Sequence, residues 1–263
     1  MKHSLPVTIS LVILFLAAQI VGLIVTKQYI KGEELPLNIE RPQVEESQSY
    51  LPIVVAIIVS TIIALILIKY KSVKIWKTWF FFSIVLCLTI SFSAFINQIF
   101  AIIIAIILTY LKMFKTNVYT YNLSEIFIYG GLSGLFVPIL GLSAVFILLI
   151  LISLYDMIAV WKTKHMVKLA KFQSESNIFA GLYIPYSKNR EAILGGGDIG
   201  FPLLFAGVIL KKFDFTSAII VSICATIALL ALFMYAKKNK FYPAMPFLTV
   251  GCFIGYLVAV LLL

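Results

Sequence analysis

Two acidic side chains lie well inside hydrophobic segments of this chain: Asp156, in LISLYDMIAV, and Asp198, in LGGGDIGFP. A carboxyl group in hydrocarbon is costly, and ionisable residues inside membrane segments are usually retained for function. Two carboxyls at close range in a low dielectric do not both ionise easily, so such a pair shares one proton. The charged member can then deprotonate a water while the protonated member polarises a carbonyl. This chemistry is hydrolysis without a metal or a covalent intermediate.

The flanking charges place the two aspartates at matching depth. Asp156 lies six residues before Lys162, and Asp198 lies eight residues after Arg190. At 1.5 Å per helical residue, each carboxyl is then about 10 Å inside the same membrane face. A pair that faces across two helices requires this arrangement. The structural alternative is that Asp198 only caps a helix that begins after a glycine turn.

Gly195, Gly196 and Gly197 precede Asp198 and form a G-x-G-D motif. Glycine permits positive φ and a close approach of the backbone, so this turn leaves N–H and C=O groups accessible at membrane depth. An extended substrate can pair with such groups by strand addition. The alternative interpretation of the motif is close helix packing through Gly196-x-x-x-Gly200.

The composition predicts that a bundle of membrane helices positions these residues. The 263 residues are 62% hydrophobic and 12% charged, with a mean hydropathy of +1.07. Apolar runs of about 20 residues, long enough to cross a bilayer, recur along the chain. We therefore predict an all-α membrane protein with nine transmembrane helices. The predicted spans are residues 5–26, 51–68, 78–96, 97–112, 123–139, 140–161, 192–210, 215–236 and 243–263.

Lysine and arginine are distributed unevenly between the predicted loops. Sixteen of the 21 lie at the amino terminus or in the even-numbered loops, which the positive-inside rule places in the cytoplasm. With nine spans, the carboxyl terminus lies outside. The net charge of +10 therefore reflects membrane topology. Because the basic residues form no patch interleaved with exposed aromatic residues, we expect no nucleic-acid partner.

Three regions follow from this layout. Residues 1–161 hold membrane helices one to six and the first aspartate, and residues 192–263 hold helices seven to nine with the G-x-G-D motif. Residues 162–191, between the aspartate spans, are basic and rich in polar residues, so we predict a flexible cytoplasmic loop rather than a packed domain.

The remaining charged residues near the spans have simpler interpretations. We expect Glu125, Glu191 and Asp214 at span edges, either solvated or capping helix starts. Lys112 is expected to be a topology anchor in the cytoplasmic loop after the fourth span.

Gly131-Leu132-Ser133-Gly134 matches the G-x-S-G of rhomboid serine proteases. That chemistry requires a histidine base, and the two histidines, His3 and His165, lie outside the predicted spans. The glycines are therefore interpreted as sites of close helix contact. The chain has no H-E-x-x-H motif, and its three cysteines have no metal-ligand spacing, so we expect no metal and no cofactor.

A third motif, Pro243-Ala244-Met245, opens the ninth span. Tyr155-Asp156 in span six, G-x-G-D in span seven and this P-A-L-like element occur in an order that resembles the presenilin and signal peptide peptidase family. The resemblance covers essentially the whole chain. A cytoplasmic amino terminus is similar to the presenilins rather than to the signal peptide peptidases, whose orientation is inverted. Prepilin-type peptidases also carry GxGD, but they have fewer spans and lack the P-A-L element.

The resemblance implies a presenilin-like bundle and GxGD-type intramembrane aspartyl proteolysis. By it, Asp156 and Asp198 are the catalytic pair. Tyr155, the glycines 195–197 and the residues 243–245 would line the site and help to position substrate. Met245 departs from the family's usual Leu, but it is similar in volume and more flexible, so we expect function to be retained.

The resemblance also implies the partners. The chain is similar to a microbial, archaeal type of homologue that acts on single-span membrane proteins in the lipid bilayer without accessory subunits, and a homo-oligomer is left open. Two other function classes stay open on the residues alone. A proton-coupled transporter or channel could use the same aspartate pair. A purely structural membrane scaffold would need neither carboxyl.

Overall fold

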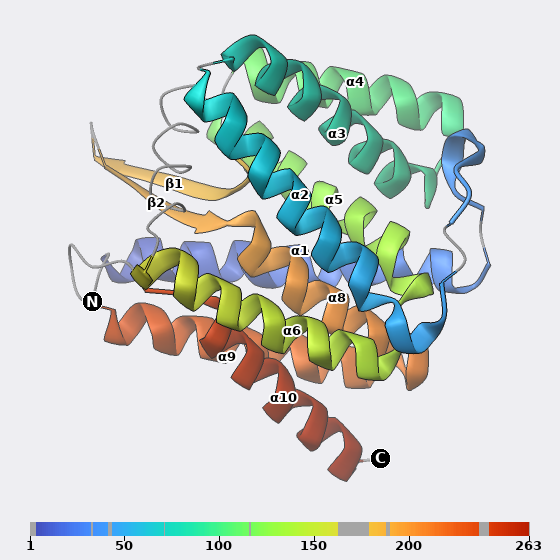
Figure 1. The fold of residues 1–263 in the computed structure, drawn as a ribbon, viewed down its shortest axis with the longest axis vertical. Coiled ribbons are helices and arrows are strands. Elements are labelled where there is room, and N and C mark those ends of the chain that lie inside the picture. Colours follow the sequence, from blue (N-terminus) through green and yellow to red (C-terminus); the bar gives the residue numbers. More distant parts are fainter. Residues whose placement is uncertain are drawn as a thin grey trace.

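Nine α-helices and one β-hairpin account for most of the part of the chain that the structure describes (Figure 1). This computed structural model describes residues 4–32, 34–41, 44–70, 72–115, 117–162, 179–187, 190–236 and 242–262. The helices are α1 (Leu5–Ile30), α2 (Tyr50–Lys69), α3 (Val73–Ser93), α4 (Gln98–Phe114), α5 (Val118–Phe136), α6 (Leu142–Met157), α8 (Gly196–Lys212), α9 (Phe215–Tyr235) and α10 (Met245–Leu262). The strands are β1 (Gly181–Ser187) and β2 (Arg190–Gly195). The short helical turns are η1 (Pro36–Asn38), η2 (Glu46–Gln48), η3 (Val137–Ile139) and the π-helical η4 (Ile158–Lys162).

Each of the nine predicted spans corresponds to one of these helices. By length and composition, seven segments of the described chain are long and apolar enough to cross a membrane, and they contain α1, α2, α3, α5, α6, α9 and α10. The other two helices, α4 and α8, have 17 residues each. At 1.5 Å per residue each is about 26 Å long, close to the hydrocarbon thickness of about 30 Å. The chain is thus an all-α, multi-pass membrane protein.

The predicted start of the seventh span is wrong. Residues 192–195 belong to strand β2, and helix α8 begins only at Gly196. Ala192 and Leu194 are buried, with exposed fractions of 0% and 3%, whereas Ile193 between them is 45% exposed. This alternation is the period of a half-buried strand. Over only four residues, this pattern also fits the start of an apolar helix, which is why the predicted span included it.

The hairpin also corrects part of the predicted flexible loop. Of residues 162–191, the stretches 163–178 and 188–189 lie outside the described residues. Strand β1 falls within the predicted loop and pairs antiparallel with β2. Figure 1 shows the hairpin at the same end of the bundle as the amino terminus, and β1 packs against α1. Segment 181–187 is therefore ordered by strand pairing and by contact with the helices.

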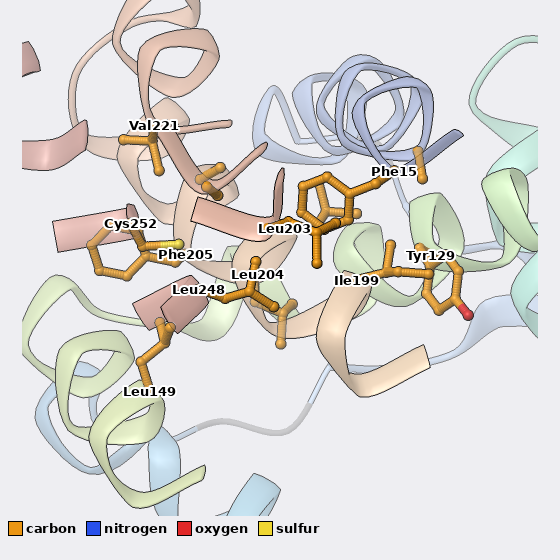
Figure 2. Packing of buried hydrophobic residues seen from close by; sticks show 14 of the residues in the cluster. Phe15, Tyr129, Leu149, Ile199, Leu203, Leu204, Phe205, Val221, Leu248 and Cys252 are labelled. Carbon is orange, nitrogen blue, oxygen red and sulfur yellow. The ribbon is translucent and has the colours of Figure 1, made fainter. Parts of the chain in front are cut away.

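Helix α8 lies at the centre of the main hydrophobic core. Figure 2 shows Leu203, Leu204 and Phe205 of α8 among side chains from the surrounding helices, including Leu149 of α6 and Leu248 of α10. All five of these side chains are at most 2% exposed. A helix that is apolar on all sides must be surrounded by others, and the buried face of α8 extends to its last turn. The second aspartate is therefore carried by the most enclosed helix of the bundle.

The G-x-S-G glycines pack helices closely, as predicted. The carbonyl of Cys87 in α3 lies against Gly131 of α5, and a Cβ built on Gly134 would lie 2.6 Å from the Tyr29 ring of α1. Between the two glycines, the Ser133 hydroxyl lies 2.6 Å from the Thr26 hydroxyl of α1. These contacts join α5 to α1 and α3, and Ser133 has a structural partner.

Replacing Gly131 by Ala is expected to destabilise the bundle. The new Cβ would lie 2.7 Å from the Cys87 carbonyl carbon, so α3 and α5 would have to separate. Overpacking of this kind costs about 1–3 kcal/mol, and backbone gives way less readily than a side chain. Thermal unfolding in detergent measures the loss. Gly200→Ala is the matched control, because its Cβ would meet its nearest neighbour at an ordinary 3.6 Å. Equal midpoints for the two variants would contradict the prediction.

Candidate active site

Asp156 lies in the last turn of α6, immediately before the π-helical turn η4. Its side chain is 8% exposed, and its Oδ2 accepts a hydrogen bond of 3.1 Å from the backbone N–H of Met245. One turn away, the hydroxyls of Ser153 and Thr249 lie 2.7 Å apart and join α6 to α10. The first aspartate is therefore held directly by the P-A-L-like motif.

Asp198 lies in the first turn of α8. The three glycines before it have no side chains, so they leave space beside its carboxyl. A Cβ added to Gly195 would lie 3.2 Å from the Asp198 Oδ2, so glycine keeps space around the carboxyl. Pro202 has no N–H for the carbonyl of Asp198 one turn back, which weakens the first turn. The Gln19 amide of α1 supports the turn by donating to the Ile199 carbonyl over 3.0 Å.

Both aspartates line one cavity of about 640 Å³ inside the bundle. The walls are mostly apolar and come from α2, α3, α5, α6, β2 and α8 and from the segment that leads into α10. Such walls limit bulk water and strengthen electrostatic interactions within the site. The structure therefore places two carboxyls from different helices on one mostly apolar cavity.

Most of the other predicted site residues surround the same cavity. The lining includes Tyr155, Gly195, Gly196, Gly197, Ala244 and Met245. The Tyr155 hydroxyl also lies 3.2 Å from the Thr61 hydroxyl of α2. Pro243 is buried but does not belong to the lining described for this cavity. The three sequence motifs, which lie up to about ninety residues apart, thus converge on one site.

The hairpin leads directly into the glycine turn. The N–H of Gly196 donates to the Ala180 carbonyl over 3.0 Å, and Gly181 lies opposite Gly195. Gly181 has φ +146°, and a Cβ there would overlap the Leu194 carbonyl, so only glycine fits at this point of β1. The strand pair therefore defines the path of the backbone up to the second aspartate.

The register decides which edge of the hairpin is accessible. Hydrogen-bonded pairs alternate along antiparallel strands, and the Gly196–Ala180 bond places Tyr183 and Ile193 in a non-hydrogen-bonded pair. Their N–H and C=O groups thus point away from each other. On the β1 side, the Asn122 amide of α5 bonds to the Tyr183 carbonyl (2.8 Å) and to its N–H (3.0 Å). On the β2 side, Ile193 lines the cavity.

A buried ion pair that the sequence did not predict lies beside the cavity. Lys112 of α4 and Glu125 of α5 are bonded through Nζ and Oε1, and each side chain is 1% exposed. The predictions of a loop lysine and of a solvated or capping glutamate are both wrong. α4 extends to Phe114 and α5 begins at Val118, so both charges lie inside helices and are tolerated because they pair. The sequence signal that could have indicated this pair is the presence of opposite charges, Lys112 and Glu125, on either side of one short loop.

The other two acids at span edges behave as expected. Asp214 caps α9, since its Oδ1 accepts the Ser217 N–H over 2.7 Å. Glu191 is exposed on β2. Within the described ranges, no group of three or more His, Cys, Asp or Glu side chains is arranged to hold a metal ion.

Comparisons with known proteins define the class. Residues 12–263 match the family described as "Signal-peptide peptidase, presenilin aspartyl protease". The match covers nearly the whole chain, so the protein belongs to this family of aspartyl proteases. No curated protein matches the chain.

Solved structures show the same fold. A presenilin family intramembrane aspartate protease in space group C222 superimposes with a TM-score of 0.71 at 18% identity, covering 97% of this chain and 99% of that chain. A structure with the same description in space group P2 gives a TM-score of 0.69 at 17% identity, covering 99% of both chains. At such low identity the likeness establishes the presenilin-like bundle, and the chemistry must be argued from this chain's residues.

Proposed function

We propose that the protein is a GxGD-type intramembrane aspartyl protease that hydrolyses peptide bonds within the membrane-spanning helices of single-span proteins. The observation that carries the proposal is the position of Asp156 and Asp198, from different helices, on one mostly apolar cavity within the bundle. The pair holds one proton between two carboxyls. The charged carboxylate takes a proton from water, and the protonated carboxyl donates to the scissile carbonyl oxygen as the tetrahedral intermediate forms.

Substrate would reach the dyad as an extended segment paired with β2. A helix hides its carbonyls, so the substrate must unwind before a peptide bond can be attacked. The outward-facing N–H and C=O of Ile193 offer an unwound segment two hydrogen bonds at the cavity wall. The opposite edge of the hairpin already pairs with Asn122. Gly195 and Gly197 let the substrate backbone approach Asp198, and residues 243–245 position it from the α10 side.

The partners and the orientation belong to the same proposal. The bias of basic residues places the amino terminus and the hairpin end of the bundle in the cytoplasm and the carboxyl terminus outside. The substrates are single-span membrane proteins within the lipid bilayer. We expect no accessory subunit and no cofactor, because both acid–base groups come from this chain.

The direct test combines the protein, reconstituted in liposomes, with a single-span substrate. New peptide fragments identified by mass spectrometry are the expected result. Substrate-dependent proton flux without new fragments would instead identify the rival class, a proton-coupled transporter using the same pair.

The cleavage rate is expected to depend on pH with an acidic and a basic limb. Full protonation removes the base and full ionisation removes the acid, so only the singly protonated pair is active. The measurement is the initial rate of cleavage in detergent from about pH 4 to about pH 9, where both limbs of a shared-proton dyad should be visible. A flat profile over this range would contradict a coupled dyad.

A further inference from the structure

The ion pair of α4 and α5 continues into a chain of contacts that reaches the glycine turn. Lys112 Nζ bonds to Glu125 Oε1, and the Tyr129 hydroxyl, one turn further along α5, donates to Glu125 Oε2. All three residues are at most 5% exposed. Glu125 and Tyr129 also line the cavity that holds both aspartates.

The ring of Tyr129 lies along the first turn of α8. A Cβ added to Gly196 would lie 2.9 Å from the Tyr129 hydroxyl, and one added to Gly200 would lie 3.9 Å from its ring. Figure 2 shows the Tyr129 ring beside Ile199, the residue that follows Asp198. The hydroxyl position therefore limits where the backbone before the aspartate can lie.

The same face of α5 holds the strand that leads to this turn. Asn122 bonds to both backbone groups of Tyr183, and the Tyr121 hydroxyl donates to the Phe179 carbonyl. The Lys112 ammonium lies 3.5 Å from the centre of the Tyr121 ring. One charged pair is thus connected to both the hairpin and the glycine turn.

We infer that Lys112, Glu125 and Tyr129 are positioning residues for the reaction: through the Tyr129–Glu125 hydrogen bond they hold the glycine turn so that Asp198 faces Asp156. The inference rests on the proposed function, because it concerns the geometry of the same dyad. A buried ion pair is weak evidence for stability, and fixing one defined arrangement of the helices is a separate role that such a pair can have. Glu125 accepts one bond from each partner, so its two oxygens fix the Tyr129 hydroxyl relative to α4.

The experiment uses Tyr129→Phe, which removes the hydroxyl and keeps the ring. Tyr119→Phe is the matched control, because this tyrosine lies on the same helix and is 85% exposed. Tyr129→Phe is expected to lower kcat on the order of tenfold or more with little change in KM, since small misplacements of reacting groups cost this much. Active sites are counted by titration with a transition-state-mimicking inhibitor, so that kcat refers to folded enzyme.

Two double variants, both without charge at positions 112 and 125, distinguish the effect of the Tyr129–Glu125 hydrogen bond from the effect of the ion pair. Lys112→Met with Glu125→Gln keeps an acceptor for the Tyr129 hydroxyl, whereas Lys112→Met with Glu125→Leu removes it. Neither leaves an unpaired buried charge. We expect the Leu combination to lower kcat by about the factor found for Tyr129→Phe, and the Gln combination to retain most of the activity. Adding Tyr129→Phe to the Leu combination should cause no further loss, because the same bond is already absent.

Amide hydrogen exchange reports the position of the turn without requiring activity. Tyr129→Phe should accelerate exchange in residues 190–198 relative to Tyr119→Phe, since the turn opens locally more often. Equal exchange and equal kcat in these two variants would overturn the inference. So would a loss confined to thermal stability, with normal kcat per active site. If Asp156→Asn still cleaved substrate, the proposed function would fail. The exchange data would still test whether Lys112, Glu125 and Tyr129 hold the glycine turn.

Discussion

Asp156→Asn and Asp198→Asn are each expected to lower the cleavage rate by about 10⁴-fold, because each variant loses one half of the acid–base pair. Asparagine matches aspartate in shape, and its amide oxygen can still accept the Met245 N–H that Asp156 accepts at 3.1 Å. Folding should therefore be retained. The measurement is the initial rate on a single-span substrate in detergent.

The control for this experiment is Asp214→Asn, an acid-to-amide change at the cap of α9. Asparagine caps helices as well as aspartate does, so this variant should cleave at the wild-type rate. A hydroxyl isostere of the transition state should protect the wild-type protein thermally, and Asp156→Asn should remove that protection. Near wild-type activity in either dyad variant would end the proposed mechanism.

Ile193→Pro is expected to reduce cleavage on the order of 10²-fold, because the substrate strand loses a backbone hydrogen bond next to the dyad. The register turns the Ile193 N–H away from β1, so proline removes no bond from the hairpin ladder. The thermal midpoint should change little. Initial rates and unfolding midpoints are measured together.

Ile193→Val is the matched control, since it keeps the N–H and most of the apolar side chain. Its cleavage rate should stay close to wild type. If Ile193→Pro and Ile193→Val cleaved at similar rates, substrate would not pair with this edge of β2. The dyad proposal would then stand with a different mode of substrate binding.

The sequence was most informative where one physical cost dominates. Burying unpaired backbone in hydrocarbon is prohibitive, so long apolar runs must be helices, and nine spans could be placed within a few residues. A carboxyl inside such a run is rare for the same reason, which singled out Asp156 and Asp198. The glycine run and residues 243–245 completed the order of motifs that resembles the presenilin and signal peptide peptidase family.

The errors occurred where two structures have similar local patterns. Residues 192–195 are apolar enough for a helix, and only pairing with β1 makes them a strand. Lys112 and Glu125 each resemble a solvated residue near a loop. Whether two such charges are solvated or meet in the interior depends on how far α4 and α5 extend and which faces they present to each other.

The sequence by itself therefore determined that this is a membrane bundle, and it predicted two carboxyls at matching depth, because the bilayer constrains each segment separately. The tertiary structure alone decided that the carboxyls line one cavity, that β2 pairs with β1 and that Tyr129 of α5 lies against the glycine turn. Each of these depends on contacts between segments far apart along the chain, and no local propensity encodes such contacts.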